Sequence, residues 1–226
     1  SSIAPALASV GRRTVDRLRS RVLGSAMGRP FRLAARVGQG TCHRLAMPPE
    51  WRALYAMRIV LSNSSYKWGG VHQITEHLAS GLTVKGHEVT LLTRPGSLLH
   101  QRLCDRHACI PLVSGGDFNP LTVARLLGVI RRLRPDLVLT MMDKDVRLSG
   151  VAARVRGVPV IARRANDEPL DSGLYSRFIY SGLVTHHIAN SQATRDTMLR
   201  SARWLNPGRI TVIHNGINIG HFEHPI

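Results

Sequence analysis

Two adjacent glycines, Gly69 and Gly70, follow a short apolar run and a polar loop, and they lead directly into an amphipathic stretch. Glycines at the start of a helix leave main-chain N–H groups bare, and the helix dipole there favours an anion such as a phosphate. The dinucleotide fingerprint G-x-G-x-x-G is missing, and so are the lysine and hydroxyl residue that complete a P-loop. Taken alone, the glycine pair fits a phosphate site or a plain tight turn.

The chain carries a formal net charge of +17 over 226 residues, and this charge is unevenly spread. Residues 1–56 contain ten arginines but only two acidic residues, Asp16 and Glu50. A basic excess attracts phosphorylated ligands, anionic lipid or nucleic acid. Aromatic residues make up only 5% of the chain and no motif that reads nucleic acid occurs, so we expect a diphosphate or an anionic membrane rather than nucleic acid.

The cysteines and paired histidines indicate no metal site. Cys42, Cys104 and Cys109 are too few for a disulfide framework, and no metal-type pairing of cysteine with histidine is evident. We expect reduced thiols, as in a cytosolic protein. His186 and His187 are neighbours in an expected strand, so their side chains should point to opposite faces and share no ion.

From residue 57 onward, apolar strands alternate with amphipathic helices. The expected strands lie at residues 57–62, 89–93, 110–113, 137–141, 159–162, 184–189 and 210–213. Between the first two, an apolar stripe predicts one buried helix face, formed by Val71, Ile74, Leu78 and Leu82. Gly86 is placed to end that helix.

Further helices have readable ends. Asn119 is a good N-cap and Pro120 suits the first helical position. Residues 146–156 form a helix rich in small side chains, and Ser191 can cap the last helix. The proline in the strand at 110–113 places that strand near an edge of the sheet.

This alternation predicts an α/β fold with a doubly wound, Rossmann-like parallel sheet covered on both faces. Ligands bind such sheets beyond the carboxyl ends of the strands. The candidate site loops are therefore residues 63–70, 94–97, 114–119, 142–145, 163–172 and 190–191.

An ordered set of short motifs resembles family 4 glycosyltransferases with the GT-B fold. The motifs are the Gly69-Gly70 loop, G-H-E-V at 86–89, R-P-D-L-V at 134–138, G-V-P-V-I at 157–161, N-S-Q-A-T at 190–194 and I-T-V-I-H-N-G-I-N at 210–218. The resemblance implies an enzyme whose N-terminal domain binds the acceptor and whose C-terminal domain binds a nucleotide-sugar donor.

The same resemblance implies a division of the chain. Residues 57–218 correspond to the N-terminal Rossmann-like domain, and residues 219–226 begin a truncated linker to a C-terminal donor domain that is absent. We therefore expect a fragment that transfers no sugar alone. Residues 1–56 lack a sustained period, so we expect a disordered or non-native leader, with a transit peptide or a membrane-surface helix as alternatives.

The resemblance also implies roles on the donor side of the site. Gly69 and Gly70 match the family's glycine loop, which approaches the donor diphosphate. Tyr66 and Lys67 flank this loop and are expected to contact the acceptor.

On the acceptor side, many family members carry a histidine after the fourth main strand, and this sequence has a run of Met, Asp and Lys there. Asp143 is the substitute expected to act on the acceptor hydroxyl, with Lys144 beside it in acceptor binding. Arg163, Arg164 and Asn166 are expected to bind a phosphorylated or lipid-diphosphate acceptor. The alternatives are a solvated charged turn and plain surface arginines.

The activity implied by the resemblance is retaining glycosyl transfer of the hexosyltransferase type. The nucleotide sugar is a co-substrate, and no metal or other cofactor is expected because this fold class stabilises the leaving diphosphate with helix dipoles and basic side chains. The expected acceptor is an envelope polysaccharide, lipopolysaccharide or lipid-linked glycan, handled in the cytoplasm at the inner face of the cytoplasmic membrane. One alternative is a non-catalytic sugar- or lipid-binding module. Another is an NAD-dependent oxidoreductase, which the missing G-x-G-x-x-G fingerprint disfavours.

Overall fold

A computed structural model of the chain describes residues 56–216, which build one sheet of seven parallel strands. The strands are β1 (Arg58–Asn63), β2 (Glu88–Thr93), β3 (Ala108–Pro111), β4 (Leu137–Thr140), β5 (Val160–Arg164), β6 (His186–Ala189) and β7 (Ile210–Val212). Their order is β3-β2-β1-β4-β5-β6-β7. The chain therefore winds outward in both directions from β1, which confirms the predicted doubly wound sheet.

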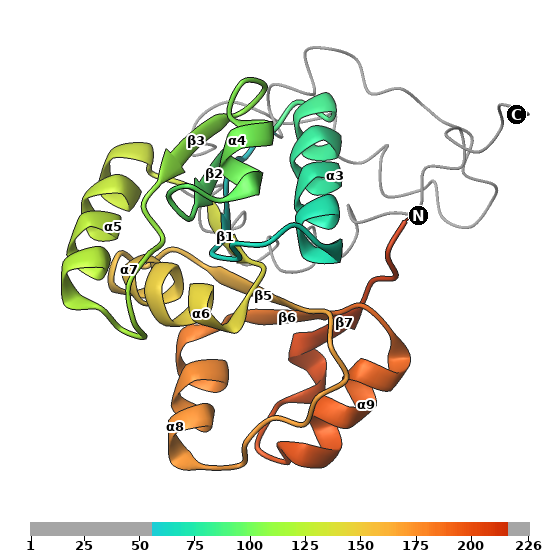
Figure 1. The fold of residues 1–226 in the computed structure, drawn as a ribbon. Helices are drawn as coiled ribbons and strands as arrows, with labels where there is room; N and C mark the ends of the chain where they lie inside the picture. The colour runs from blue at the N-terminus through green and yellow to red at the C-terminus, as the bar shows by residue number, and fades with distance from the viewer. Residues whose placement is uncertain (1–55, 217–226) are drawn as a thin grey trace, which may run out of the picture. The chain divides into compact units, whose positions relative to one another are not determined.

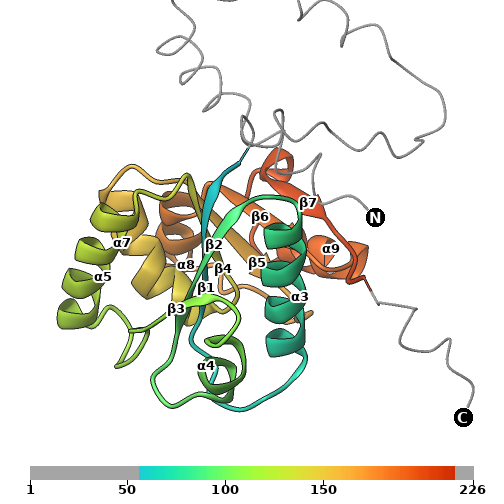
Figure 2. The ribbon, with the colours of Figure 1, turned by 90° about the horizontal axis from the view of Figure 1, so that it is seen from above.

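Helices cover both faces of this sheet. The bounds are α3 (Gly70–Val84), α4 (Leu98–Leu103), α5 (Pro120–Leu133), α6 (Asp143–Asp145), α7 (Val151–Val155), α8 (Leu174–Arg177) and α9 (Gln192–Ser201), with π-helical segments at Val146–Gly150 and Phe178–Leu183 and a 3-10 turn at Pro207–Arg209. α3 and α9 lie against one face, and α5 and α7 lie against the other (Figures 1 and 2).

The core fills the two layers between the sheet and its helices. All residues of β1 except the first are buried, as expected for a central strand covered on both faces. One buried cluster joins Val60, Val138 and Val160 of the central strands with Leu126 and Ile130 of α5. This packing fixes the carboxyl ends of β1 and β4 relative to each other.

The predicted helix ends are confirmed. Asn119 Oδ1 accepts a hydrogen bond from the Thr122 N–H at 3.0 Å, one residue before the helix begins at Pro120. Ser191 caps α9 in the same way. Gly86 has a φ of 88°, a left-handed conformation that suits glycine at the end of α3. β3 lies at one edge of the sheet, as its proline predicts, and β7 lies at the other.

The paired histidines also lie as expected. His186 Nε2 is 2.8 Å from Thr211 Oγ1, whereas His187 Nε2 is 2.9 Å from the main-chain oxygen of Tyr180. Because these partners belong to different elements, the two imidazoles do not share a site.

The prediction for the buried face of α3 was wrong by about one position. The predicted stripe is half-buried except at Leu82, and the buried residues are His72, Thr75, Ala79 and Leu82. Thr75 can be buried because its hydroxyl accepts from Asn63 Nδ2 at 2.9 Å and donates to the main-chain oxygen of Val71 at 2.7 Å. Hydrophobic periodicity cannot detect polar side chains that are satisfied in this way.

Two of the predicted site loops are partly regular structure. β5 continues through Arg163 and Arg164, so both arginines belong to a buried strand rather than to a loop at 163–172. Residues 142–145 contain the short helix α6. The short helices α4 and α8 were not predicted, because neither is long enough to show a helical period.

The expectation of reduced thiols was wrong for two of the three cysteines. Cys104 and Cys109 form a disulfide that joins the end of α4 to β3, with Cα atoms 5.3 Å apart. Cys42 lies outside the described residues.

The structure leaves the predicted ends of the domain untested. Residues 1–55 and 217–226 are outside the described part of the chain, so the expectations for the leader at 1–56 and the linker at 219–226 stay predictions. Between residues 56 and 216, no helix has the length and the apolar character needed to cross a membrane.

Candidate functional site

The strand order changes direction between β1 and β4, and this switch point is where an open α/β sheet forms a ligand crevice. The loop from Ser64 to Gly69 follows β1 here, and α6 follows β4. Asn63, the last residue of β1, anchors the loop: its Oδ1 accepts from the Ser65 N–H at 2.9 Å while its Nδ2 donates to Thr75 of α3. The loop is thus tied to the sheet and to the helix.

The glycine pair opens α3 at this switch point. Gly69 is the N-cap residue in an extended conformation, and no side chain caps the helix there. A Cβ built on Gly69 or Gly70 would meet nothing within 4 Å. Packing therefore does not require glycine at either position. The helix N terminus faces open space, where the helix dipole favours an anion.

Arginines lie over both aromatic rings of the glycine loop. Arg94 lies over the Tyr66 ring at 5.0 Å and Arg102 lies over the Trp68 ring at 4.2 Å, measured from each guanidinium carbon to the ring centroid. Trp68 also stacks on His72 of α3, with ring centroids 5.3 Å apart. These contacts hold the loop and place positive charge beside it. Sequence analysis placed Trp68 and Arg94 in candidate site loops without giving either a role, and it missed Arg102 because α4 gave no signal.

Of the two predicted residues beside the loop, Tyr66 is 52% exposed. Lys67 is also exposed. Neither side chain is needed by the core, so both remain available to a ligand at the mouth of the crevice.

Across the crevice, Asp143 of α6 is paired with Arg164 of β5. Arg164 Nη1 lies 3.5 Å from each carboxylate oxygen of Asp143, and its Nη2 donates to the main-chain oxygen of Glu168 at 2.8 Å. The Arg164 side chain is 7% exposed and that of Asp143 is 47% exposed. Asp143 is thus a carboxylate that pairs with Arg164 on one side and is open to solvent on the other, so both its predicted role and the alternative of a solvated charged turn stay open.

The Tyr180 hydroxyl belongs to the same group of side chains. Burial raises the pKa of Tyr180 well above its usual value, and the neighbouring Asp143 carboxylate raises that pKa further. Lys144 is half-buried beside Asp143. Tyr180 comes from a π-helical segment that the sequence pattern did not reveal.

Arg163 and Asn166 do not join this group by any direct bond. Arg163 is buried, and its Nη2 donates to Asn215 Oδ1 at 2.6 Å. Burial lowers the pKa of Arg163 below its usual value. Asn166 is exposed and donates to Glu168 Oε2 at 2.7 Å. Because both arginines of β5 are buried and bonded, the alternative of plain surface arginines is wrong.

Asp145 is a fully buried carboxyl beneath the crevice, and sequence reasoning did not single it out. Its Oδ2 accepts from the Met142 N–H at 2.9 Å. Burial raises its pKa to about 7, opposed by the Ser64 hydroxyl and by main-chain N–H groups of Ser64, Met141 and Met142. Asp145 therefore connects the loop after β1 with the turn after β4.

Within residues 56–216, one group of metal-type ligands comes close enough to share an ion. It consists of His100, Cys104 and Cys109, which belong to α4 and β3 and not to the β1–β4 crevice.

The sequence matches the family model for Glycosyltransferase Family 4 over residues 68–221. Among solved structures, the fold is similar to a glycosyltransferase from Rickettsia africae, with 18% identity and a TM-score of 0.64 over 75% of this chain and 45% of that chain. It is also similar to HepE from Anabaena in complex with UDP-glucose, with 17% identity and a TM-score of 0.59 over 73% and 45% of the two chains. The lipopolysaccharide outer core galactosyltransferase WaaB gives 14% identity and a TM-score of 0.53 over 72% and 47%.

At these identities the structural likeness is one of fold. No curated protein matches the sequence. The chain spans about 45% of the length of the first two structures that it resembles.

Proposed function

The chain belongs to Glycosyltransferase Family 4, and on this premise we propose that residues 57–216 form the acceptor-side half of a GT-B glycosyltransferase. The donor is a nucleotide sugar, and the acceptor is an envelope glycan or a lipid-linked sugar. The excess of basic residues supports peripheral contact with the anionic inner face of the cytoplasmic membrane, where such acceptors are held.

The observation that carries this proposal is the open N terminus of α3 at the switch point of the sheet. As the bond between the sugar and the diphosphate breaks, negative charge develops on the leaving diphosphate. Bare N–H groups at Gly69 and Gly70 and the dipole of α3 oppose that charge. Arg94 and Arg102 add positive charge beside the loop and so contribute to this stabilisation.

On the acceptor side, Asp143 is the group that we assign to the acceptor hydroxyl. Its exposed oxygen face can accept the hydroxyl proton while Arg164 holds the carboxylate in place. The acceptor oxygen then bonds to the anomeric carbon on the same face from which the diphosphate leaves, so the configuration is retained. Tyr66, Lys67, Lys144 and Asn166 provide the polar rim that binds the acceptor.

The two buried arginines act indirectly in this proposal. Arg164 positions Asp143, and Arg163 positions Asn215 at the carboxyl end of β7. Neither guanidinium is exposed enough to bind an acceptor phosphate as surface arginines would.

The experiment is a transfer assay with the polypeptide made from the complete coding sequence. It is incubated with a panel of nucleotide sugars and with phospholipid and lipid-diphosphate acceptors, and products are analysed by NMR. We expect release of a nucleoside diphosphate only when an acceptor is present, and a product with the donor's anomeric configuration. Binding of glycans with no transfer across the panel would instead favour a non-catalytic sugar-binding module.

A further inference from the structure

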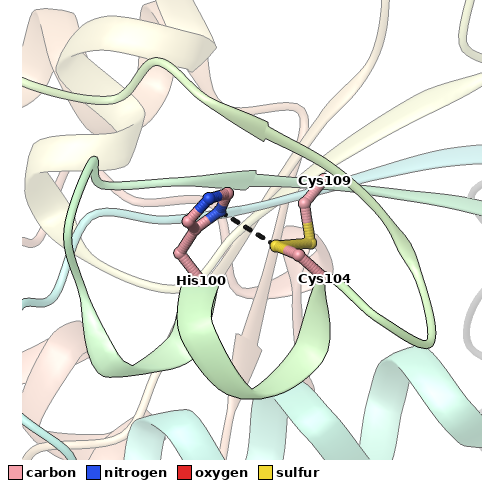
Figure 3. A group of neighbouring side chains, drawn as sticks. All are labelled: His100, Cys104 and Cys109. Carbon is pink, nitrogen blue, oxygen red and sulfur yellow. Dashed lines mark hydrogen bonds between the residues drawn. A yellow bond between two sulfur atoms is a disulfide. The ribbon is translucent and has the colours of Figure 1, made fainter.

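The group His100, Cys104 and Cys109 is independent of the proposed transferase site. His100 and Cys104 are four residues apart at the end of α4, so their side chains lie on the same side of the helix. Cys109 faces them from β3 (Figure 3). His100 Nδ1 lies 2.9 Å from Cys104 Sγ, and the three possible ligand atoms lie within 4.8 Å of one another.

The histidine of this group is held in position by neighbouring groups. Thr93 Oγ1 lies 3.2 Å from His100 Nδ1, and Thr93 is fully buried at the end of β2. The main-chain N–H of His100 donates to the capping Ser97 Oγ at 3.2 Å. All three members are half-buried, so an ion or a small reductant can reach them. The imidazole is therefore held beside the two sulfurs, and Nδ1 must exchange its contact with Thr93 Oγ1 for a bond to the ion.

The chemistry of the three ligand atoms suits a thiophilic divalent ion. One imidazole nitrogen and two cysteine sulfurs are a ligand set typical of zinc. Tetrahedral zinc with bonds of about 2.0–2.3 Å places neighbouring ligand atoms roughly 3.5–3.8 Å apart. To reach that geometry the two sulfurs must separate from bonding distance, which requires reduction of the disulfide and movement of the Cys104 and Cys109 side chains.

We propose that the reduced form of this protein binds one zinc-class ion through His100 Nδ1 and the sulfurs of Cys104 and Cys109. A thiol-class reductant supplies two electrons and two protons to the Cys104–Cys109 disulfide and is itself oxidised to a disulfide. Metal binding then displaces the two thiol protons to solvent, and water completes the coordination. The disulfide form holds no ion, because its sulfurs are bonded to each other.

Arg102 and Arg106 lie within two residues of Cys104 in the sequence, and their positive charges oppose the binding of a cation. Arg106 pairs with Glu76 at 3.9 Å, however, and Arg102 lies over the Trp68 ring. Both positive charges are thus partly engaged elsewhere.

The test uses the full chain in two redox states. The protein is reduced with a phosphine, desalted without oxygen and titrated with Co²⁺ as a spectroscopic probe and then with Zn²⁺. We expect one equivalent of Co²⁺ to give thiolate-to-metal charge-transfer absorption and tetrahedral ligand-field bands, which Zn²⁺ then removes. The oxidised protein should show neither signal.

Variants separate this site from adventitious binding. His100→Ala, Cys104→Ser and Cys109→Ser should each lose the signal, while His107→Ala is the matched control because His107 lies nearby and bonds to Ser80 instead. Circular dichroism checks that each variant is folded. The inference is overturned if the reduced parent gives no thiolate–cobalt absorption, or if His100→Ala and His107→Ala bind equally well. In the first case the cysteines would be a redox pair without a metal, and in the second His100 would not be a ligand.

Discussion

Replacing the buried Asp145 with asparagine should remove the part of the pH dependence of stability that this carboxyl contributes. The carboxyl of Asp145 is fully buried between the loop after β1 and the turn after β4. Asparagine has almost the same shape. Its oxygen can accept the Met142 N–H, as Asp145 Oδ2 does. The substitution therefore removes the charge and leaves the packing in place.

The magnitude follows from the raised pKa. The pKa of Asp145 rises from 3.8 to about 7 on folding. Each pKa unit corresponds to about 1.4 kcal/mol, so ionising this carboxyl inside the folded protein costs on the order of 4 kcal/mol. Folding binds a proton here, so the contribution of Asp145 to stability is complete below pH 3.8 and is lost as pH rises to about 7.

The assay is urea unfolding of the parent and Asp145→Asn at several pH values between 4 and 8. Relative to the parent, the variant should gain up to about 4 kcal/mol in the free energy of unfolding as pH rises across this range. His187, whose pKa burial lowers to about 4, has the opposite pH dependence, but its effect is common to both proteins and cancels in the difference. A difference that does not change with pH would show that Asp145 is ionised in the folded protein, and would refute the reasoning.

Three further outcomes are expected. Asp143→Asn should lower kcat of the full-length enzyme by about 10²-fold or more, because the amide cannot take the acceptor proton. The loss of stability should be small, because the Asp143 carboxylate is half-exposed. An unchanged kcat in steady-state kinetics would show that Asp143 takes no part in the reaction. Asn215→Ala should lower the free energy of unfolding by about 1–2 kcal/mol by leaving the buried Arg163 without its partner, and an unchanged melting temperature would contradict this. The purified 226-residue chain should show no transfer in a nucleotide-sugar assay, because one glycine loop cannot supply the stabilisation that transferases need, and robust turnover would show that the donor site is misplaced.

The strands and the capped helices could be predicted because their signals are local. The central strands are near-continuous apolar runs, and β1 is buried at every position except its first. The side chains of Asn119 and Ser191 cap their helices by accepting a hydrogen bond from the main-chain N–H three residues later. The position of Gly69 and Gly70 at the start of the first helix could also be predicted, whereas their place at the switch point follows from the strand order of the structure.

The remaining features depend on partners that are distant in the sequence. Arg164 was predicted in a loop because it is charged. It is nevertheless buried in β5, where it forms an ion pair with Asp143, 21 residues earlier in the sequence. The disulfide and its histidine are brought together by α4, a helix of six residues that is too short for a period and begins at a Ser97 cap. Asp145 gives no sequence signal, because nothing local distinguishes a buried carboxyl from a solvated one.

The most direct test of the central claim compares two valines on the same helix. Gly70→Val places a side chain at the open N terminus of α3, where a diphosphate would approach, and Gly81→Val places the same side chain near the other end; a Cβ at either position meets nothing within 4 Å. In the full-length enzyme, Gly70→Val should lower kcat/KM for sugar transfer by about 10²-fold or more with an unchanged melting temperature, while Gly81→Val keeps its activity. Equal activity of the two folded variants would contradict the account, because the glycine loop would then be only a turn.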